Sequence, residues 1–318
     1  MNKKLLVVAI GAIAALPFSA QAAGPTLYGK LNLSLENKDN GTVDTWTVES
    51  NASRLGVKGD AETGVDGVTG IYVAEFEVKA DDGTGPFKAR NIYTGIKGGF
   101  GTVLMGNVDT PTKTVQGKVD QFNDTRADMK ALVAGDLRAP NVLAYATPKL
   151  GDAVTVTAAL WQSEAAGDGI GEATSVSAVY DNDGLYLGVG MDMEVPATGG
   201  VALTANAASD ITRVVAGYSS DSFDIGFLYQ MAEEAVAANE DTSMLIGGAF
   251  KSGDLKIKAQ YVTTDGDTAG VTNTETLMAF GADYSVGKAT TVYGWFAMNE
   301  DDGTLEDQYL SLGIEQKF

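Results

Sequence analysis

Neither cysteine nor histidine occurs anywhere in the 318 residues. Without cysteine the chain cannot form a disulfide, a Cys-based redox centre or a thiolate zinc site, so its stability must come from hydrogen-bond ladders and packing. Without histidine there is no base for a Ser-His-Asp triad. Carboxylate pairs could still act as acids and bases. The composition therefore argues against an enzyme without excluding one.

Metal-binding motifs are also missing. Two acidic turns, at 265–267 and 301–303, carry oxygen ligands, but neither has the spacing of a calcium loop. Asp-Gly pairs of this kind are typical of turns. We therefore expect no metal site and no cofactor.

Long hydrophobic runs are absent after residue 22. A membrane helix needs roughly 20 consecutive apolar residues. Only helices and closed barrels satisfy all backbone groups in lipid. If the chain resides in a membrane, it must do so as a β-barrel.

The first residues have the pattern of an export signal. A basic start at 2–4 precedes the uncharged apolar run 5–16, and small residues at 20–22 form a cleavage site. The pattern predicts a signal peptide over 1–22 and a mature, exported chain over 23–318. The alternative is an uncleaved N-terminal anchor.

Basic residues are scarce, and the formal net charge is −20 at pH 7. Such a field repels nucleic acid and attracts cations to the surface. We expect no nucleic-acid partner. The excess of acid could also serve only the solubility of exposed loops.

Strand signals, by contrast, recur along the whole chain. Runs rich in Val, Ile, Leu, Tyr and Thr alternate with Gly, Asp and Asn clusters. They predict sixteen strands, an even number as bacterial barrels require, with a break at Ser50-Asn51-Ala52 that could split the second. The predicted strands are 26–36, 43–60, 67–79, 88–98, 100–108, 140–148, 153–163, 172–182, 184–194, 210–220, 222–233, 242–252, 254–264, 275–285, 289–299 and 308–318.

The two faces of these strands differ. In 26–36, leucines occupy one face, and Lys30, Asn32 and Ser34 share the other. A water-soluble barrel keeps its apolar face inside, whereas a membrane barrel turns it to lipid around a wet lumen. The pattern predicts an all-β fold, a 16-stranded antiparallel transmembrane β-barrel in contact with outer-membrane lipid.

Connections between the strands alternate in length. Short turns such as 98–99 and 182–183 alternate with longer acidic links, for example 234–241, 265–274 and 300–307. Alternation is typical of barrel hairpins whose two ends face different compartments. A soluble β-sandwich could also show many hairpins but needs no such rhythm.

One segment, about 108–140, departs from the rhythm. It lacks strand alternation and carries charges of both signs together with apolar residues. A loop this long in a compact repeat is usually functional or disordered. The apolar residues favour an ordered loop that folds inward, anchored by Val115, Val119, Phe122, Met129, Leu132 and Val133.

Several short motifs occur in a particular order along the chain. Together they resemble the Gram-negative general diffusion porins, most specifically in the first half of the chain. The motifs are Leu27-Tyr28-Gly29-Lys30, Arg54-Leu55-Gly56-Val57-Lys58-Gly59, Ile71-Tyr72-Val73-Ala74-Glu75, Arg90-Asn91-Ile92-Tyr93-Thr94-Gly95-Ile96-Lys97, Arg138-Ala139-Pro140-Asn141 and the terminal Phe318.

The resemblance implies an outer-membrane protein that is usually a homotrimer, with the third loop folded into the lumen of the barrel. It implies passive, water-filled diffusion of small hydrophilic solutes and ions, with no enzyme activity. It also implies that Phe318 is a terminal signal for the outer-membrane assembly machinery.

The resemblance further implies a charged constriction. Its wall cations would be Lys30, Arg54, Arg90 and Arg138. The acidic side would be drawn from Glu75 on the wall and from Asp120, Asp124 and Asp128 on the loop. Charges in a narrow pore set ion preference. Alternatively, each strand arginine could merely pair with a neighbouring carboxylate.

Acidic loops would enrich cations at the mouth, while the wall cations oppose strong cation selectivity, so we expect a pore with a weak preference for cations. Two other functions stay open at this point. One is a solute-specific channel on the same barrel. The other is a secreted soluble β-protein.

Overall fold

The computed structural model describes residues 24–82, 85, 87–162 and 170–318. The signal peptide expected over 1–22 lies outside the described residues. Across the described ranges, no helix has the length and apolar character needed to cross a membrane.

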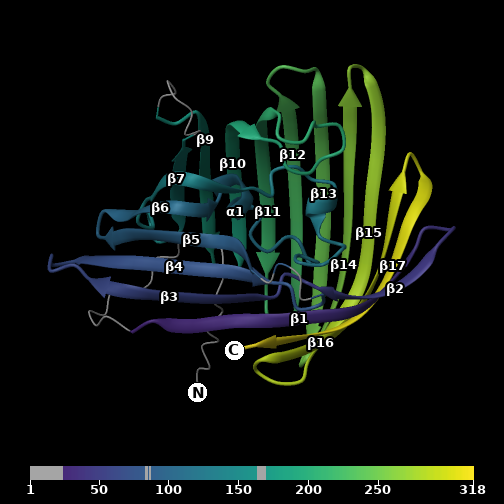
Figure 1. Cartoon of the computed structure of the whole chain (residues 1–318), viewed down its shortest axis with the longest axis horizontal. Coiled ribbons are helices and arrows are strands. Elements are labelled where there is room, and N and C mark those ends of the chain that lie inside the picture. The colour runs from purple at the N-terminus through teal and green to yellow at the C-terminus, as the bar shows by residue number, and fades with distance from the viewer. Residues whose placement is uncertain (1–23, 83–84, 86, 163–169) are drawn as a thin grey trace.

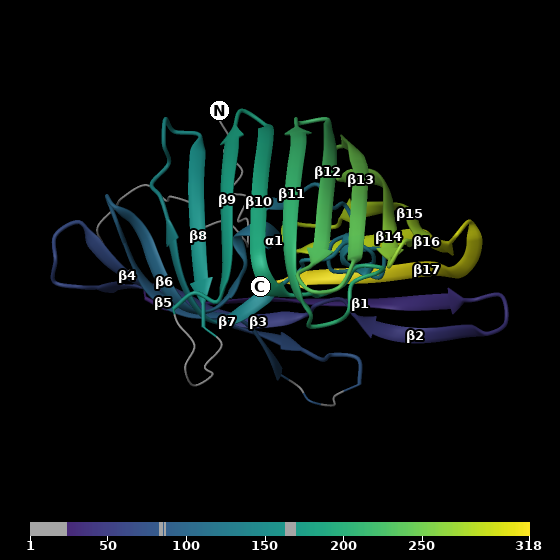
Figure 2. The same cartoon turned by 90° about the horizontal axis from the view of Figure 1, so that it is seen from above.

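All strands belong to one antiparallel sheet that closes into a barrel, because the last strand, β17, pairs with β1 (Figures 1 and 2). Both β2 and β3 pair with β1, so they are successive halves of one barrel strand. This confirms the predicted sixteen and the expected split. The bounds are β1 Thr26–Asp39, β2 Asp44–Ser50, β3 Arg54–Glu62, β4 Val68–Val78, β5 Phe87–Gly98, β6 Gly101–Asp109, β7 Arg138–Ala146, β8 Val154–Trp161, β9 Ala173–Asn182, β10 Leu185–Pro196, β11 Ala208–Ser219, β12 Phe223–Glu234, β13 Asn239–Ser252, β14 Leu255–Thr268, β15 Val271–Ser285, β16 Thr290–Asp301 and β17 Thr304–Lys317.

The break between β2 and β3 shifts the register of the wall by one residue. Leu33 is paired with Ser50 before the break, and Lys30 is paired with Arg54 after it. Ala52, within the break, has a φ of 48°. Extra residues of this kind re-aim the side chains that follow them. The break thus sets Arg54 directly opposite Lys30.

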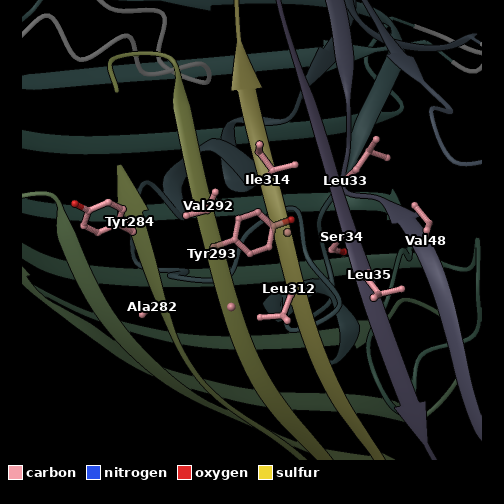
Figure 3. A pocket seen from close by; sticks show the side chains of 12 residues that line it. Leu33, Ser34, Leu35, Val48, Ala282, Tyr284, Val292, Tyr293, Leu312 and Ile314 are labelled. Atoms are coloured by element: carbon pink, nitrogen blue, oxygen red, sulfur yellow. The ribbon is translucent and has the colours of Figure 1, made fainter. Parts of the chain in front are cut away.

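The two faces of β1 follow the predicted alternation. Leu31 and Leu35 are exposed on the outside, whereas Asn32, Ser34 and Glu36 are buried on the inside. Exposed apolar side chains continue around the barrel, and over β1, β2 and β15–β17 they line a groove of about 640 Å³ (Figure 3). An apolar exterior around a polar interior is the reverse of a soluble barrel.

One part of the interior contradicts the expectation of a wet inner face. From β11 to β16 that face carries buried Val215, Leu228, Leu245, Val262 and Leu277, which form one cluster with apolar residues of the segment between β6 and β7. Trp161 and Trp295 are buried inside the barrel as well, whereas Trp46 is exposed.

The long acidic links predicted near 234–241, 265–274 and 300–307 are mostly strand. The turn between β14 and β15 contains only two residues, 269 and 270, and that between β16 and β17 only 302 and 303. Their acidic composition suggested loops, but ladder pairing with the neighbouring strand decided the structure. Several of the acidic side chains therefore stand on extended hairpins.

Candidate functional site

The segment between β6 and β7, residues 110–137, is here called the β6–β7 segment. It begins with helix α1, Pro111–Val115, whose first turn is capped by the Thr110 side chain and carries proline where no backbone donor is needed. A short 3-10 helix, η1, follows at Met129–Ala131. Figure 2 shows α1 within the ring of strands.

The predicted anchors of this segment are buried. Each is at most 3% exposed, and all join the apolar cluster on the inner wall. The cluster gives the β6–β7 segment a hydrophobic base on β11 to β16. The anchors are Val115, Val119, Phe122, Met129, Leu132 and Val133.

Glycines on the wall allow the segment to lie close. A Cβ added at Gly226 on β12 would stand 2.6 Å from the Val119 Cβ, and one at Gly190 on β10 would stand 2.8 Å from the Thr112 Cα. Any larger residue would push the segment away from the wall. The segment is thus fitted against one side of the barrel.

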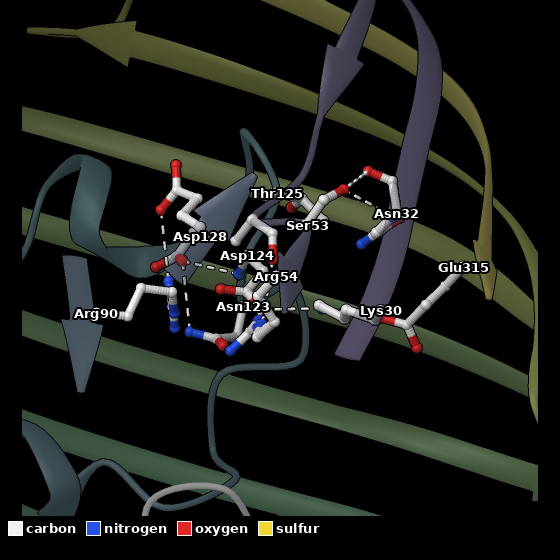
Figure 4. A network of polar contacts seen from close by, with 12 residues as sticks. Lys30, Asn32, Ser53, Arg54, Arg90, Asn123, Asp124, Thr125, Asp128 and Glu315 are labelled. Carbon is white, nitrogen blue, oxygen red and sulfur yellow. Dashed lines mark hydrogen bonds and ion pairs between the residues drawn. The ribbon is translucent and has the colours of Figure 1, made fainter. Parts of the chain in front are cut away.

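Asp124 joins the β6–β7 segment to the opposite wall (Figure 4). Its carboxylate accepts from Lys30 Nζ at 3.0 Å and from the Arg54 guanidinium. Lys30 also pairs with Glu315 on β17 at 2.9 Å. Asp124 has a φ of 68°, a left-handed conformation that aspartate tolerates better than most residues. The sharp turn directs its side chain toward the two cations.

The cations determine the charge state of Asp124. Burial alone would raise the pKa of this carboxyl, but Arg54 and Lys30 hold the pKa well below its usual range. Opposite charges within a few ångströms favour the ionised form in this way. Asp124 therefore remains an anion through ordinary acidic conditions.

Asp120 does not take the position we expected for it. Its carboxylate accepts backbone N–H bonds from Phe122 at 2.8 Å and Met129 at 3.0 Å, and the residue is 8% exposed. Burial, together with the nearby charge of Asp128, raises the pKa of Asp120 well above its ordinary value. Asp120 therefore stabilises the fold of the β6–β7 segment, because its hydrogen-bond donors are backbone groups of that same segment. The acidic residue that faces the wall cations is Asp124.

Glu75 and Arg90 form a second pair, on the wall itself. Arg90 Nε donates to Glu75 Oε1 at 2.6 Å, and the Tyr28 hydroxyl donates to Glu75 Oε2 at 3.1 Å. Glu75 is only 1% exposed. It lies where the β4–β5 register shifts between Ala74 and Phe76, a bulge that sets it beside Arg90.

Arg138 stands apart from that pair, at the base of the β6–β7 segment. Its Nη2 lies 2.9 Å from Asp109, the last residue of β6. Lys113 also pairs with Asp109, at 3.0 Å, and with Asp136 at 2.6 Å. The four charges tie the two ends of the segment together.

Sequence reasoning missed Arg126 and its partners. Arg126 Nε lies 3.2 Å from Glu36 on β1, and its Nη2 lies 3.1 Å from Glu49 on β2. These residues line a small polar pocket of about 190 Å³ together with Lys38 and others. Their wide separation in sequence hid the contact, although opposite charge on a loop and on inward strand positions was a usable signal.

The site therefore brings charges of both signs together across the inside of a closed barrel. Over the described residues, no group of His, Cys, Asp or Glu is arranged to hold a metal ion. Fixed charges beside a lumen act on passing ions and dipoles without bond chemistry.

A family model described as "Gram-negative porin" matches residues 7–304. The chain belongs to the Gram-negative porin family. Porins are channels and not enzymes, and this protein is a passive channel of the outer membrane. The resemblance drawn from the sequence motifs is confirmed.

Individual relatives agree with the family assignment. The chain is 23% identical over 350 residues to the "Major outer membrane protein P.IB" of Neisseria lactamica, with 100% of both chains covered. It is 25% identical over 310 residues to the "Monosaccharide porin" of a Halomonas species, covering 85% of this chain and 82% of that one. Among solved structures, an "Anion-selective porin from Comamonas acidovorans" matches with a TM-score of 0.75 and 19% identity, covering 94% of this chain and 100% of that one.

Proposed function

We propose that the β6–β7 segment and the wall facing it form the charged constriction of a water-filled channel for small hydrophilic solutes and ions. The observation that carries this proposal is the contact of Asp124 with Lys30 and Arg54, which joins the segment to the wall of β1 and β3. Arg90 and Glu75 line the same wall, and Arg138 lies at the base of the segment. Asp120 supports the segment from within.

The charge balance supports a weak preference for cations. The wall cations are compensated, since Lys30 contacts two carboxylates and Arg90 contacts Glu75 and Glu77. Compensated cations offer little net attraction to anions, while the net charge of −20 enriches cations at the mouths. The expected selectivity therefore differs from that in the name of the Comamonas protein.

The mature protein, in this proposal, is a homotrimer. The trimer is proposed from the family resemblance. We also propose that the signal peptide over 1–22 is removed on export, and that the outer-membrane assembly machinery recognises Phe318. The apolar outer belt supports contact with lipid or with another copy. Cross-linking of the purified protein in mild detergent should give a band of three chains.

Planar-bilayer recording tests the channel and its selectivity. Purified protein in a salt gradient should give ohmic steps with a reversal potential on the cation side. Replacing both Arg54 and Arg90 with glutamine removes two positive charges from the wall and should move that potential further in the same direction. Firm preference for anions would contradict the charge argument, and a failure to form steps would contradict the channel.

A solute-specific channel is the second candidate, favoured by the relative named for monosaccharides. A binding site for one solute would make the ion current fall and saturate as that solute is added. Titration of the open channel with glucose, with a disaccharide as the control, separates the two. Proportional loss of current for both sugars supports general diffusion, and saturating block by one supports specificity.

A further inference from the structure

Among the residues that the structure describes, Arg213 on β11 is the largest side chain that is fully enclosed by the protein, with 0% of its surface exposed. Long charged side chains are almost never fully buried unless their hydrogen-bond groups are satisfied. None of the contacts described above for the constriction involves this guanidinium, so its own hydrogen-bond partners indicate its role.

Its donors reach both ends of the β6–β7 segment. Nη1 donates to the carbonyl of Thr112 at 3.2 Å, near the start of the segment, and Nη2 donates to the carbonyl of Ala134 at 2.7 Å, near its end. Nε donates to Gln230 on β12 at 2.7 Å, and the Gln230 amide donates to the same Ala134 carbonyl at 2.9 Å. The rigid fork of a guanidinium can serve two separated acceptors in a way that an ammonium cannot.

The segment has other buried bonds to the barrel wall, such as those from Thr112 to Ser175 on β9 and from Thr264 on β14 to the Leu132 carbonyl, but neither of these two reaches both of its ends. Its ion pairs hold it differently. Lys113 joins the two ends to each other through Asp109 and Asp136, but not to the far wall. In the Lys30–Asp124 pair, the two side chains are 13% and 17% exposed. Water and ions therefore weaken this pair. The hydrogen bonds of Arg213 are shielded from water, and they join the segment to the wall of β11 and β12.

We propose that Arg213 is the positioning residue of the constriction. It pins both ends of the β6–β7 segment to β11, and this fixes how far the segment extends across the lumen. The inference rests on the proposed channel function. Without the guanidinium the Thr112 and Ala134 carbonyls each lose one donor, although Ala134 keeps that of Gln230. The ends of the segment then gain freedom to move as ions pass.

Single-channel recording tests the proposal. Arg213→Met should give channels that still open but show a several-fold rise in open-channel current noise and close at a lower voltage. Arg213→Lys keeps the charge but cannot span both carbonyls, so it should be noisy as well. Lys58→Met removes an inward cation that stacks on Tyr28, 4.9 Å from the ring centroid, and should leave the noise unchanged.

Thermal unfolding of the same variants distinguishes positioning from stability. A role in barrel stability alone would lower the unfolding temperature of the Arg213 variants without raising the current noise of the channels that remain folded.

Quiet current from folded Arg213→Met and Arg213→Lys channels would overturn the proposal while leaving the channel function intact. If the Met variant does not assemble, the Lys variant decides. Absence of current from the unaltered protein would instead count against the channel function itself.

Discussion

At the scale of single residues, two aspartates of the same segment have opposite roles. Asp124 faces Lys30 and Arg54, whereas Asp120 accepts from the backbone of its own segment. Sequence reasoning treated them alike, because both are acidic residues in one loop. Their difference depends on the left-handed turn at Asp124 and on the folded path around Asp120.

Replacing these aspartates one at a time therefore makes a matched test. Asp124→Asn removes an ionised carboxylate between two cations, and a hydrogen bond to a charged group contributes about 1.5–3 kcal/mol. It should shift the reversal potential toward anions. Asp120→Asn makes the same formal change at a group of raised pKa and should shift it much less. Equal shifts would contradict the assignment.

The effect of acidification on the Asp124 pairing can also be predicted. The pKa of Asp124 is lowered, so its pairing is fully present above the unfolded-state pKa of about 3.9 and is lost only as pH falls through the depressed folded-state pKa. The Asp124-dependent part of the selectivity should thus persist at pH 4, which bilayer recordings of Asp124→Asn against the unaltered protein can check.

At the scale of elements, the β6–β7 segment and the wall from β11 to β16 depend on each other. The segment supplies apolar anchors, and the wall supplies inward apolar residues and glycines where a uniform membrane barrel would have polar ones. The anchors were predicted from composition. The apolar wall on which the anchors pack was not predicted, since inward strand positions were expected to face water.

Two paired glycines on this wall test the fit. Gly226 and Gly217 are register partners, but an added Cβ would meet Val119 at 2.6 Å from Gly226 and at 3.5 Å from Gly217. Overpacking of this kind costs about 1–3 kcal/mol. Gly226→Ala should displace the segment and change single-channel conductance, while Gly217→Ala should not. The same conductance for both would argue against a tight fit.

At the scale of the whole molecule, barrel closure joins the two ends of the described chain. Gly29 and Phe318 exchange backbone hydrogen bonds of 3.0 and 3.1 Å, and the Phe318 ring covers Gly29. The closing contact and the expected assembly signal thus lie in the same residue. The two roles predict different failures.

Phe318→Ala separates those roles. If the assembly machinery recognises the Phe318 ring, the variant should accumulate less in the outer membrane of cells. Protein refolded in detergent should still form channels of unchanged conductance. Fractionation of cells and bilayer recording of refolded protein measure the two. Normal yield in cells would remove the assembly role.

Local sequence patterns are sufficient to predict the barrel. Sixteen alternating strands, a break near Asn51 and the bounds of the β6–β7 segment follow from local periodicity and turn chemistry, which act between near neighbours. Which charged groups come into contact depends instead on the folded chain. Asp124 with Lys30 and Arg213 with Thr112 are joined across long sequence distances. Closure, register and the path of the segment set those contacts, and no local pattern encodes them.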